Sequence, residues 1–359
     1  MRPLFLFVYA IQLCHSSLLA DPIPCGMDRS ACAGADFSPP LIERVFRFVT
    51  VGDTGRRGEA LSSTGDRLRR LSLETPFQFV GMVGDLAYPN GFQNSTDPNF
   101  QFVFQDPFAD IQVPFNPVLG DNDYGDENGI GSLSVYPLYS QVDDRWDMPS
   151  LFYSRLYEYA GVSICSVYID TQSLVGIPNP EARSPEELAY LDEQLPWLDM
   201  KLGSERCQTS NFIVVFGHHP LISVSKKGNK GDAAAILGSK LDPLFDRHRV
   251  DAYFAGHDHD MQATTLRDAS DHSMSYIVSG SSSRLRDKAF EGPLVGLLAW
   301  VRRDVIGFTI SEVSPSKMTT IFLASATGEV VHSHKTWSHR GLRMKQRFRD
   351  DNGKSFSRA

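Results

Sequence analysis

Five short apolar runs of this chain each end in a glycine that is followed at once by a side chain able to bind a metal ion. The runs are rich in β-branched and aromatic residues, which favours strands over helices. Glycine lets the backbone turn sharply after a strand and brings the next side chain to the rim of a sheet. The five motifs are Gly52-Asp53-Thr54-Gly55, Gly84-Asp85-Leu86-Ala87-Tyr88, Gly120-Asp121-Asn122-Asp123, Gly217-His218-His219 and Gly256-His257-Asp258-His259.

Helical patterns lie between the expected strands, which are Val45–Val51, Phe77–Val83, Ile111–Leu119, Val162–Ile169, Phe212–Phe216 and Val250–Ala255. The clearest helix begins at the capping box Ser184-Pro185-Glu186-Glu187 and continues with leucines at three- and four-residue spacing. Pro196 is expected to kink this helix and Gly203 to end it. Strands that alternate with helices predict an α/β core.

The C-terminal part of the chain does not show the alternation of strands and helices. Three sequential antiparallel strands are expected over Ala299–Val313, Met318–Ala324 and Glu329–His334. From Lys335 to Ala359 there are eight Lys or Arg against two Asp, which predicts a basic, disordered tail. An acidic partner or a membrane surface is an alternative role for this tail. The expected domain therefore spans residues 44–334, after a surface lead-in over residues 21–43 that is rich in Pro, Ala and Gly.

The N-terminus has the pattern of a signal peptide over residues 1–20. Arg2 is followed by the apolar stretch Leu4–Leu13, and Leu18, Leu19 and Ala20 offer a cleavage point before Asp21, although a buried strand is the alternative interpretation. Cleavage would leave four cysteines, which fits an oxidising compartment. The pair Cys25–Cys32 is the easiest local one, with connectivity left open, and the glycosylation sequon is Asn94-Ser95-Thr96. These features predict the secretory pathway, with a secreted, lysosomal or vacuolar protein.

Composition excludes several classes of protein. The chain has 359 residues with 42% apolar and 11% aromatic residues, which is too apolar for a disordered protein. Its net charge is −8, and basic residues are in excess only at the C-terminal end, so no nucleic-acid partner is expected. After the N-terminus, no apolar run approaches the ~18–20 residues that a membrane span needs. No transmembrane helix is therefore expected.

The strand-end motifs together offer a set of metal ligands. Hard oxygens from Asp and Tyr suit Fe(III) or Mn, and imidazoles suit Zn or Fe(II). Seven ligands are too many for one tetrahedral ion, and they suit two ions that share a carboxylate, as in metal-assisted phosphoryl displacement. A single Gly-Asp is more often a turn, but five motifs in strand context favour a site. The ligand candidates are Asp53, Asp85, Tyr88, Asp121, His218, His257 and His259.

These motifs, in this order, resemble the purple or tartrate-resistant acid phosphatases of the calcineurin-like metallophosphoesterase superfamily. The resemblance covers roughly residues 44–334 and includes the segments Arg145-Trp146-Asp147-Met148-Pro149-Ser150, Gln194-Leu195-Pro196-Trp197-Leu198 and Tyr276-Ile277-Val278-Ser279-Gly280. It implies a four-layer α/β/β/α sandwich with two mixed sheets and antiparallel C-terminal strands. It also implies a dinuclear centre of Fe(III) with a divalent ion, which is Fe, Zn or Mn.

The resemblance assigns the ligands to two ions. Asp53, Tyr88 and His259 would bind the ferric ion, and Asp121, His218 and His257 would bind the divalent ion. Asp85 would bridge them.

Three positions depart from the family pattern. The family has Gly-Asn-His-Asp or Gly-Asn-His-Glu where this chain has Gly120-Asp121-Asn122-Asp123, so Asp121 replaces a ligand asparagine. Asn122 replaces a histidine that contacts phosphate, and it can donate a hydrogen bond but cannot transfer a proton. A second outer histidine aligns with Lys227, and His219 is the neighbour that would partly substitute. Asn122 and His219 are therefore the candidate catalytic residues.

The expected function is a secreted or lumenal acid phosphatase that hydrolyses phosphate monoesters, with weakened proton donation to the leaving group. Two alternatives stay open. The sequence Gly328-Glu329-Val330-Val331-His332-Ser333-His334-Lys335 resembles the ending of the glideosome-associated membrane scaffold, a degenerate branch of the family. That resemblance implies a metal-binding, catalytically weak scaffold protein. A phosphoesterase acting on nucleotides or diesters is the other alternative.

Overall fold

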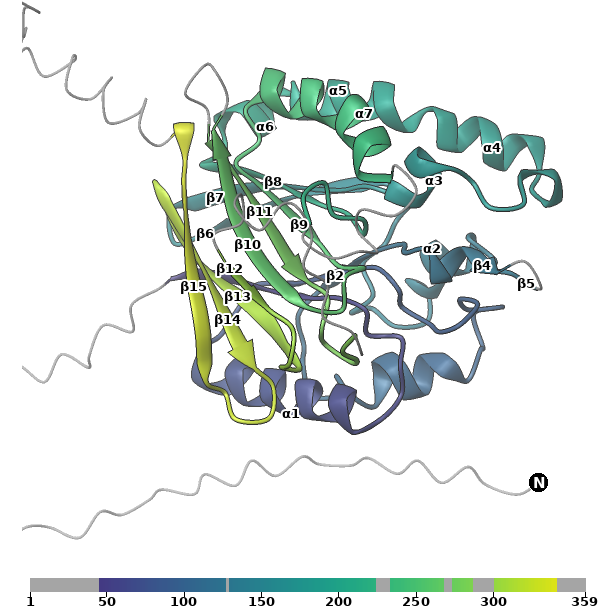
Figure 1. Cartoon of the computed structure of the whole chain (residues 1–359), viewed down its shortest axis with the longest axis horizontal. Coiled ribbons are helices and arrows are strands. Elements are labelled where there is room, and N and C mark those ends of the chain that lie inside the picture. Colours follow the sequence, from purple (N-terminus) through teal and green to yellow (C-terminus); the bar gives the residue numbers. More distant parts are fainter. Residues whose placement is uncertain (1–44, 127–128, 224–232, 268–272, 287–299, 341–359) are drawn as a thin grey trace, which may run out of the picture. The chain divides into compact units, whose positions relative to one another are not determined.

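Two mixed β-sheets form the centre of the protein in a computed structural model that describes residues 45–126, 129–223, 233–267, 273–286 and 300–340. The six-stranded sheet has the order β15-β14-β13-β1-β2-β3, and the seven-stranded sheet has the order β12-β10-β11-β9-β8-β7-β6 (Figure 1). A separate two-stranded ribbon pairs β4 with β5. The expected signal peptide, the lead-in with Cys25 and Cys32, Lys227 and most of the basic tail lie outside the described residues.

The strands are β1 Phe46–Val51, β2 Val80–Val83, β3 Phe115–Val118, β4 Gly125–Asp126, β5 Gly129–Ile130, β6 Tyr153–Tyr159, β7 Val162–Tyr168, β8 Phe212–Phe216, β9 Ala252–Ala255, β10 Met261–Arg267, β11 Ser273–Ser279, β12 Trp300–Arg302, β13 Gly307–Ser314, β14 Lys317–Ala324 and β15 Val330–Trp337. The helices are α1 Glu59–Glu74, α2 Val135–Tyr139, α3 Thr171–Val175, α4 Pro185–Asp192, α5 Gln194–Leu202, α6 Glu205–Thr209 and α7 Ala233–His248. Three short non-α turns of helix are η1 Gln101–Gln105, η2 Asn122–Tyr124 and η3 Pro180–Ala182.

Aromatic side chains fill the space between the two sheets. Phe48 of β1 lies 5.9 Å from Phe216 of β8 and 5.5 Å from Phe254 of β9, measured between ring centroids. Along β8, Phe212, Val214 and Phe216 face this inter-sheet core, whereas Ile213 and Val215 face the helices on the other side. Because alternate residues of a strand point to opposite faces, a strand buried on both faces is apolar throughout. This explains the uninterrupted apolar run at Phe212–Phe216.

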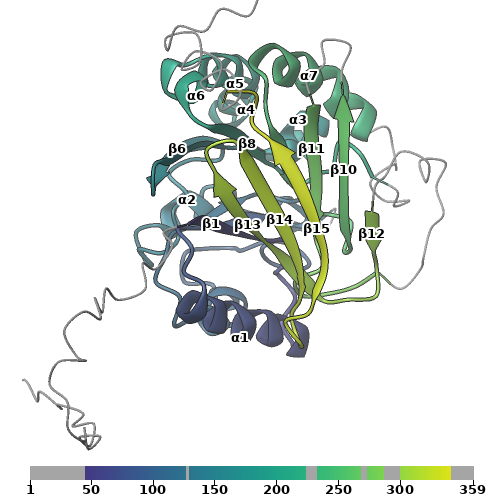
Figure 2. The same cartoon turned by 90° about the vertical axis from the view of Figure 1, so that its left-hand side faces the viewer.

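Helices cover the outer faces of both sheets and complete four layers (Figure 1). Helix α1 buries Leu61 and Leu68 against the six-stranded sheet. Helices α5 and α7 pack on the seven-stranded sheet through the buried side chains Leu198, Leu202, Leu237, Leu241 and Phe245. The fold is therefore the expected four-layer α/β/β/α sandwich, and its C-terminal strands β13, β14 and β15 run antiparallel to one another (Figure 2).

Parallel strands bring five loops to one edge of the sandwich. In the first sheet β1, β2 and β3 are parallel, and in the second β7, β8, β9 and β11 are parallel. The carboxyl ends of parallel strands meet at a common edge, where ligand crevices form in α/β sheets. The loops after β1, β2, β3, β8 and β9 carry the five glycine-led motifs.

One expectation about local structure was wrong. The segment Ala299–Val313 is two strands rather than one, because β12 pairs with β10 in the second sheet and β13 pairs with β1 in the first. The leucine-rich helix is interrupted at Glu193, between α4 and α5, close to the expected disruption by Pro196. Pro196 has no N–H to donate to the carbonyl of Asp192, so the first helix ends at that residue.

The described chain continues beyond residue 334. Strand β15 runs to Trp337, and the backbone N–H of Ser338 donates to the carbonyl of Ser316 over 3.0 Å. The guanidinium of Arg340 is buried, where it donates to the carboxylate of Asp251 over 2.6 Å. Residues 335–340 therefore continue β15 and its contacts with the neighbouring strands.

One disulfide joins the sheet to a helix among the described residues. Cys165 of β7 is bonded to Cys207 of α6, 42 positions along the chain. The sequence left the connectivity of the cysteines open and favoured the local pair Cys25–Cys32, which lies outside the described residues. In the same described part of the chain, no helix combines the length and the apolar character needed to cross a membrane.

Candidate metal centre

Three of the predicted ligands sit at strained positions directly after strands. Asp53, Asp85 and His257 have φ angles of 55°, 54° and 69°, in the left-handed region that side chains other than glycine rarely occupy. Such strain concentrates at functional sites, where the surrounding structure holds it. Gly84, with φ of 81°, permits the close approach of the loops, since a Cβ there would lie 2.4 Å from Nδ1 of His218.

The first group of donor atoms consists of Asp53, Tyr88 and His259. The Tyr88 hydroxyl donates to Oδ1 of Asp53 over 3.1 Å and lies 3.3 Å from Nε2 of His259. Nε2 of His259 is 3.1 Å from the same Asp53 oxygen. The second oxygen of Asp53 accepts the backbone N–H of His257 over 2.8 Å, which fixes the carboxylate. Two oxygens and one imidazole nitrogen therefore converge on one point.

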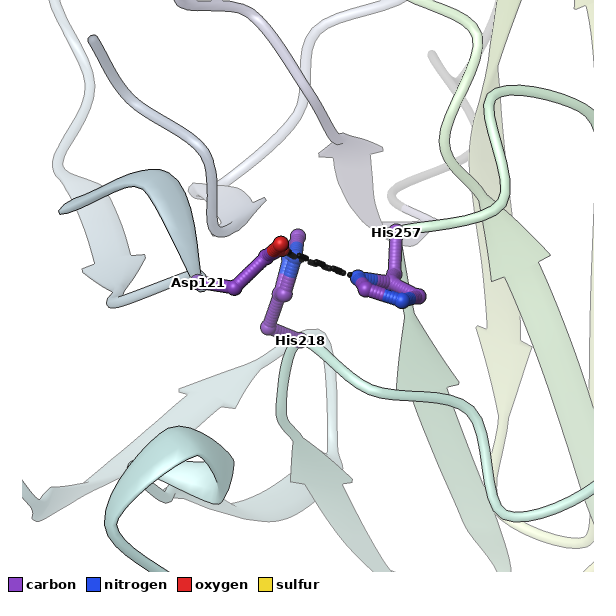
Figure 3. Close-up of side chains that lie close together, drawn as sticks. All are labelled: Asp121, His218 and His257. Atoms are coloured by element: carbon purple, nitrogen blue, oxygen red, sulfur yellow. Dashed lines mark hydrogen bonds and ion pairs between the residues drawn. The ribbon is translucent and has the colours of Figure 1, made fainter. Parts of the chain in front are cut away.

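The second group consists of Asp121, His218 and His257, whose side chains point toward one another from three different loops (Figure 3). Oδ1 of Asp121 lies 3.0 Å from Nε2 of His218 and 3.0 Å from Nδ1 of His257. The two nitrogens are 3.1 Å apart. Nδ1 of His218 faces the carbonyl oxygen of Val83 at 2.8 Å, so its Nε2 is the atom presented to the group.

The spacing of these donors fits metal ions. With metal–ligand bonds of about 2.1 Å, two donors at a right angle lie about 3.0 Å apart. Both triangles have sides of 3.0–3.3 Å, so each offers three donors on one face of an octahedral or distorted site. The first group is mainly oxygen and the second mainly nitrogen, which suits a harder ion beside a borderline divalent one.

Asp85 lies between the two groups. Its Oδ1 is 3.4 Å from Nε2 of His218 in the second group. Donor atoms of Asp53, Asp85 and His218 all lie within 4.8 Å of one another, so Asp85 also adjoins the first group. The carboxylate is fully buried, and a buried charge needs compensation from cations or hydrogen bonds. Its position suits a carboxylate shared by two ions.

Electrostatics within the site also favour cations. Burial raises the pKa of Tyr88 well above its usual value, and the charges of Asp53 and Asp85 raise it further. Burial alone would lower the pKa of His218, but Asp85, Asp121 and Asp53 raise it to about 10. Since ligands must lose their protons to bind a metal, metal uptake by this site releases protons.

Asp121 keeps its negative charge. Burial would raise its pKa, but the hydrogen bonds and charges of His218 and His257 outweigh burial and hold the pKa well below the usual range. The aspartate is also the most exposed member of its group, with a side chain 32% accessible to solvent.

The two predicted catalytic residues lie beside these groups. Asn122 donates its backbone N–H to Oδ1 of Asp85 over 3.0 Å and its side-chain amide to Oδ2 over 2.7 Å. The ring of His219 lies 4.5 Å from that of His257, and its Nδ1 is 3.0 Å from Oγ1 of Thr171. All nine predicted site residues are thus brought together at one sheet edge.

Sequence reasoning missed the role of Asp123, although it lies within a quoted motif. Its buried carboxylate accepts the backbone N–H groups of Leu86, Ala87 and Gly120 and the hydroxyl of Tyr136, at 2.7–3.2 Å. Asp123 therefore ties the loop after β2 to the loop after β3. Burial and the charge of Asp85 raise the pKa of Asp123 to about 7. The repeated acidic residue in Gly120-Asp121-Asn122-Asp123 was the available signal.

Comparisons with known proteins agree with this geometry. The chain is 28% identical over 300 residues to the tartrate-resistant acid phosphatase type 5 of Oryctolagus cuniculus, covering 78% of this chain and 87% of that protein. Among solved structures it is similar to GAP50, the anchor in the inner membrane complex of Plasmodium, with a TM-score of 0.68, 22% identity and coverage of 86% and 95%. It is also similar to purple acid phosphatase PPD1 from yellow lupin (Lupinus luteus) seeds, with a TM-score of 0.62 and 17% identity, covering 83% of this chain and 55% of that one.

The family model gives the broader assignment. Residues 46–261, more than half of the chain, match the model of the calcineurin-like phosphoesterases. This range holds every candidate ligand, from Asp53 to His259. The resemblance to tartrate-resistant and purple acid phosphatases and the sandwich fold are thereby confirmed. With its candidate metal ligands clustered at the sheet edge, the chain belongs to the calcineurin-like phosphoesterase family.

Proposed function

We propose that this protein is an acid phosphatase that hydrolyses phosphate monoesters at a dinuclear metal centre. The observation that carries the proposal is the pair of donor groups with Asp85 between them. Asp53, Tyr88 and His259 would hold a ferric ion, Asp121, His218 and His257 a divalent Fe, Zn or Mn ion, and Asp85 both. When bound, the two ions would supply Lewis acidity and activate the water that attacks phosphorus.

The neighbouring side chains determine which esters react best. The Asn122 amide is directed at Asp85 in this structure and has no proton to transfer to a leaving group. His219 is the adjacent group that can carry a proton, and Thr171 fixes its ring through Nδ1. General acid catalysis contributes about 10²–10⁴-fold in rate. The proposed enzyme therefore favours phosphate esters whose leaving groups need little protonation.

The leaving-group argument has its own test. The Asn122→His variant is expected to raise turnover of alkyl phosphates more than turnover of p-nitrophenyl phosphate, whose leaving group is already acidic. Equal changes on both substrates would indicate that residue 122 acts only through positioning. An unchanged rate on both would assign proton donation to His219.

The proposed compartment is the secretory pathway, with a secreted, lysosomal or vacuolar destination. The Cys165–Cys207 disulfide and the similarity to tartrate-resistant acid phosphatases support it. The sequon residue Asn94 is exposed, so its side chain is accessible to glycosylation. Mass spectrometry of the protein secreted by a eukaryotic host would detect both cleavage before Asp21 and a glycan at Asn94.

A catalytically weak scaffold protein is the second candidate. The structural similarity to GAP50, which is described as an anchor in a membrane complex, favours it. Against it stands the full set of donor side chains at all seven ligand positions.

One experiment separates the two candidates. The full chain is purified, its bound metals are measured, and p-nitrophenyl phosphate hydrolysis is followed across acidic pH. If the protein is a phosphatase, it should bind two metal equivalents and hydrolyse the substrate. Asp85→Ala should lose both properties. The control Asp110→Ala, at a surface side chain that is 71% exposed, should keep both. Two bound metals without turnover would favour the scaffold.

A further inference from the structure

A loop that follows β11 carries two arginines to the metal centre. The loop is fixed to the strand-end segment Gly52–Asp53 at three points. The N–H of Ser282 donates to the carbonyl of Gly52 over 3.3 Å, the N–H of Gly52 donates to the hydroxyl of Ser282 over 3.1 Å, and the hydroxyl of Ser283 donates to the carbonyl of Asp53. The residues that come next, Arg284 and Arg286, are therefore held beside the first group of donors.

The two arginines make different contacts. Arg286 donates from its NH2 group to the carbonyl oxygen of His257 over 3.2 Å, so it supports the backbone of a ligand residue. The guanidinium carbon of Arg284 lies 5.1 Å from the centroid of the Tyr88 ring. Tyr88 in turn donates to Asp53 over 3.1 Å. Arg284 thus places its positive charge against the face of a ligand residue without being a ligand itself.

The guanidinium of Arg284 has an unsatisfied donor. Its Nε atom is shielded from solvent and donates to no acceptor among the described residues. A buried donor without an acceptor costs free energy, and such groups in a native structure require an explanation. Arginine also presents a planar array of N–H groups that matches the oxygens of phosphate. An anion that enters the metal centre would supply the missing acceptor.

We propose that Arg284 is a phosphate-binding residue of the metal centre, contacting the phosphoryl group of substrate and product. The proposal deepens the proposed phosphatase function and rests on it for the identity of the anion. The charges of the site explain the need for such a residue. Asp53, Asp85 and Asp121 place three carboxylates around the two donor groups, and these would cancel part of the positive charge that bound metal ions offer to a phosphate dianion. Arg284 offsets one of these charges at the rim.

Calorimetric titration of the metal-loaded full chain with inorganic phosphate tests the proposal. Arg284→Gln removes the charge and the forked guanidinium donors, and it should weaken phosphate binding by about tenfold or more while both metals stay bound. Arg284→Lys keeps the charge but not the forked donors, so its affinity should fall between the two. The matched control is Arg247→Gln, which removes a surface arginine on α7 and should leave phosphate affinity unchanged.

The following results would contradict the proposal or limit it. Unchanged phosphate affinity in Arg284→Gln overturns it, and so does loss of metal in that variant, since a phosphate-binding side chain is not a metal ligand. Should the glutamine variant fail to fold, the lysine variant decides, and wild-type affinity there overturns the proposal. Absence of turnover in the wild type, with phosphate binding that depends on Arg284, would reject the phosphatase function alone. Turnover with no role for Arg284 in phosphate binding would reject only this inference.

Discussion

Asn122 holds both oxygens of Asp85, through its backbone N–H at 3.0 Å and its side-chain amide at 2.7 Å. The residue that follows the ligand Asp121 is therefore directed at the carboxylate between the two donor groups. A side chain that orients a ligand affects metal affinity even though it does not touch the ion. Asn122 is thus a positioning residue for Asp85 as well as a candidate for contact with substrate.

The first prediction concerns this positioning. Asn122→Ala removes the amide and leaves the backbone contact, so affinity for the metals should fall by about tenfold or more. The measurement is a competition titration of the loaded protein with a chelator. Asn99→Ala, at an exposed position, is the control and should behave as wild type. Equal metal retention in Asn122→Ala and Asn99→Ala would contradict the positioning role.

The second prediction concerns colour. Burial and the charges of Asp53 and Asp85 raise the pKa of Tyr88, so only a strong cation can remove the phenol proton at acidic pH. A phenolate on Fe(III) absorbs visible light by charge transfer, so the iron-loaded protein should be violet or pink. Tyr88→Phe should abolish this band, and Tyr159→Phe, at an exposed position on β6, should keep it. A colourless wild type with two equivalents of iron bound would reject the Tyr88 assignment.

The third prediction concerns the charge of Asp121. His218 and His257 hold its pKa well below the usual range, so the carboxylate stays ionised at acidic pH. At metal saturation, Asp121→Asn removes one negative charge and should tighten phosphate binding by about tenfold. It should also raise the reduction potential of the second metal. Asp199→Asn, on the surface of α5, is the matched control. Phosphate affinity and potential that are unchanged in Asp121→Asn would refute the charge argument.

The fourth prediction concerns stability in acid. Burial lowers the pKa of His334 on β15 to about 4, and the ring nitrogen Nε2 lies 2.9 Å from Oγ1 of Thr265 and 3.1 Å from Oγ of Ser275. An unfolded histidine has a pKa of about 6.5, so between pH 6.5 and 4 the unfolded chain binds a proton that the folded chain does not. The free energy of unfolding should therefore fall as the pH falls through this range, by about 3 kcal/mol at most for this group.

The test compares wild type and His334→Gln as metal-free proteins in urea at pH 7 and pH 5. Glutamine keeps hydrogen-bonding capacity but does not titrate, so the variant should lose less stability on acidification. An identical loss in both proteins would show that His334 does not contribute.

The strand-end motifs and their side chains were predictable because their signals are local. Strand β8 has its predicted bounds, and Asp53, Asp85, Asp121, His218 and His257 each follow a glycine at the end of a strand. These features depend only on turn geometry and on the alternation of strands with helices.

Pairing between distant segments was not predictable from such signals. The strands β12 and β13 are close in sequence but belong to different sheets, because each pairs with a strand chosen by the tertiary fold. Arg284 also gave no signal, since its place beside Tyr88 depends on hydrogen bonds between the β11 loop and the end of β1. Local patterns carry no information on such contacts. The hydrogen bond between Gly52 and Ser282, for example, joins residues 230 positions apart in sequence.

Strand β1 lies between β2 and β13, and its pairing with β13 joins Phe46 to Val313. During synthesis the ribosome makes β1 first and β13 only near the end of the chain. The edge of β1 that pairs with β13 therefore stays unpaired during most of translation. Contacts of such long sequence separation form late because loop closure must precede them. The loop after β1 carries Asp53, and its partner His257 also comes late. A nascent chain would therefore complete the proposed ligand set only after most of the polypeptide has left the ribosome, so metal loading of the proposed centre would be one of the last events of maturation.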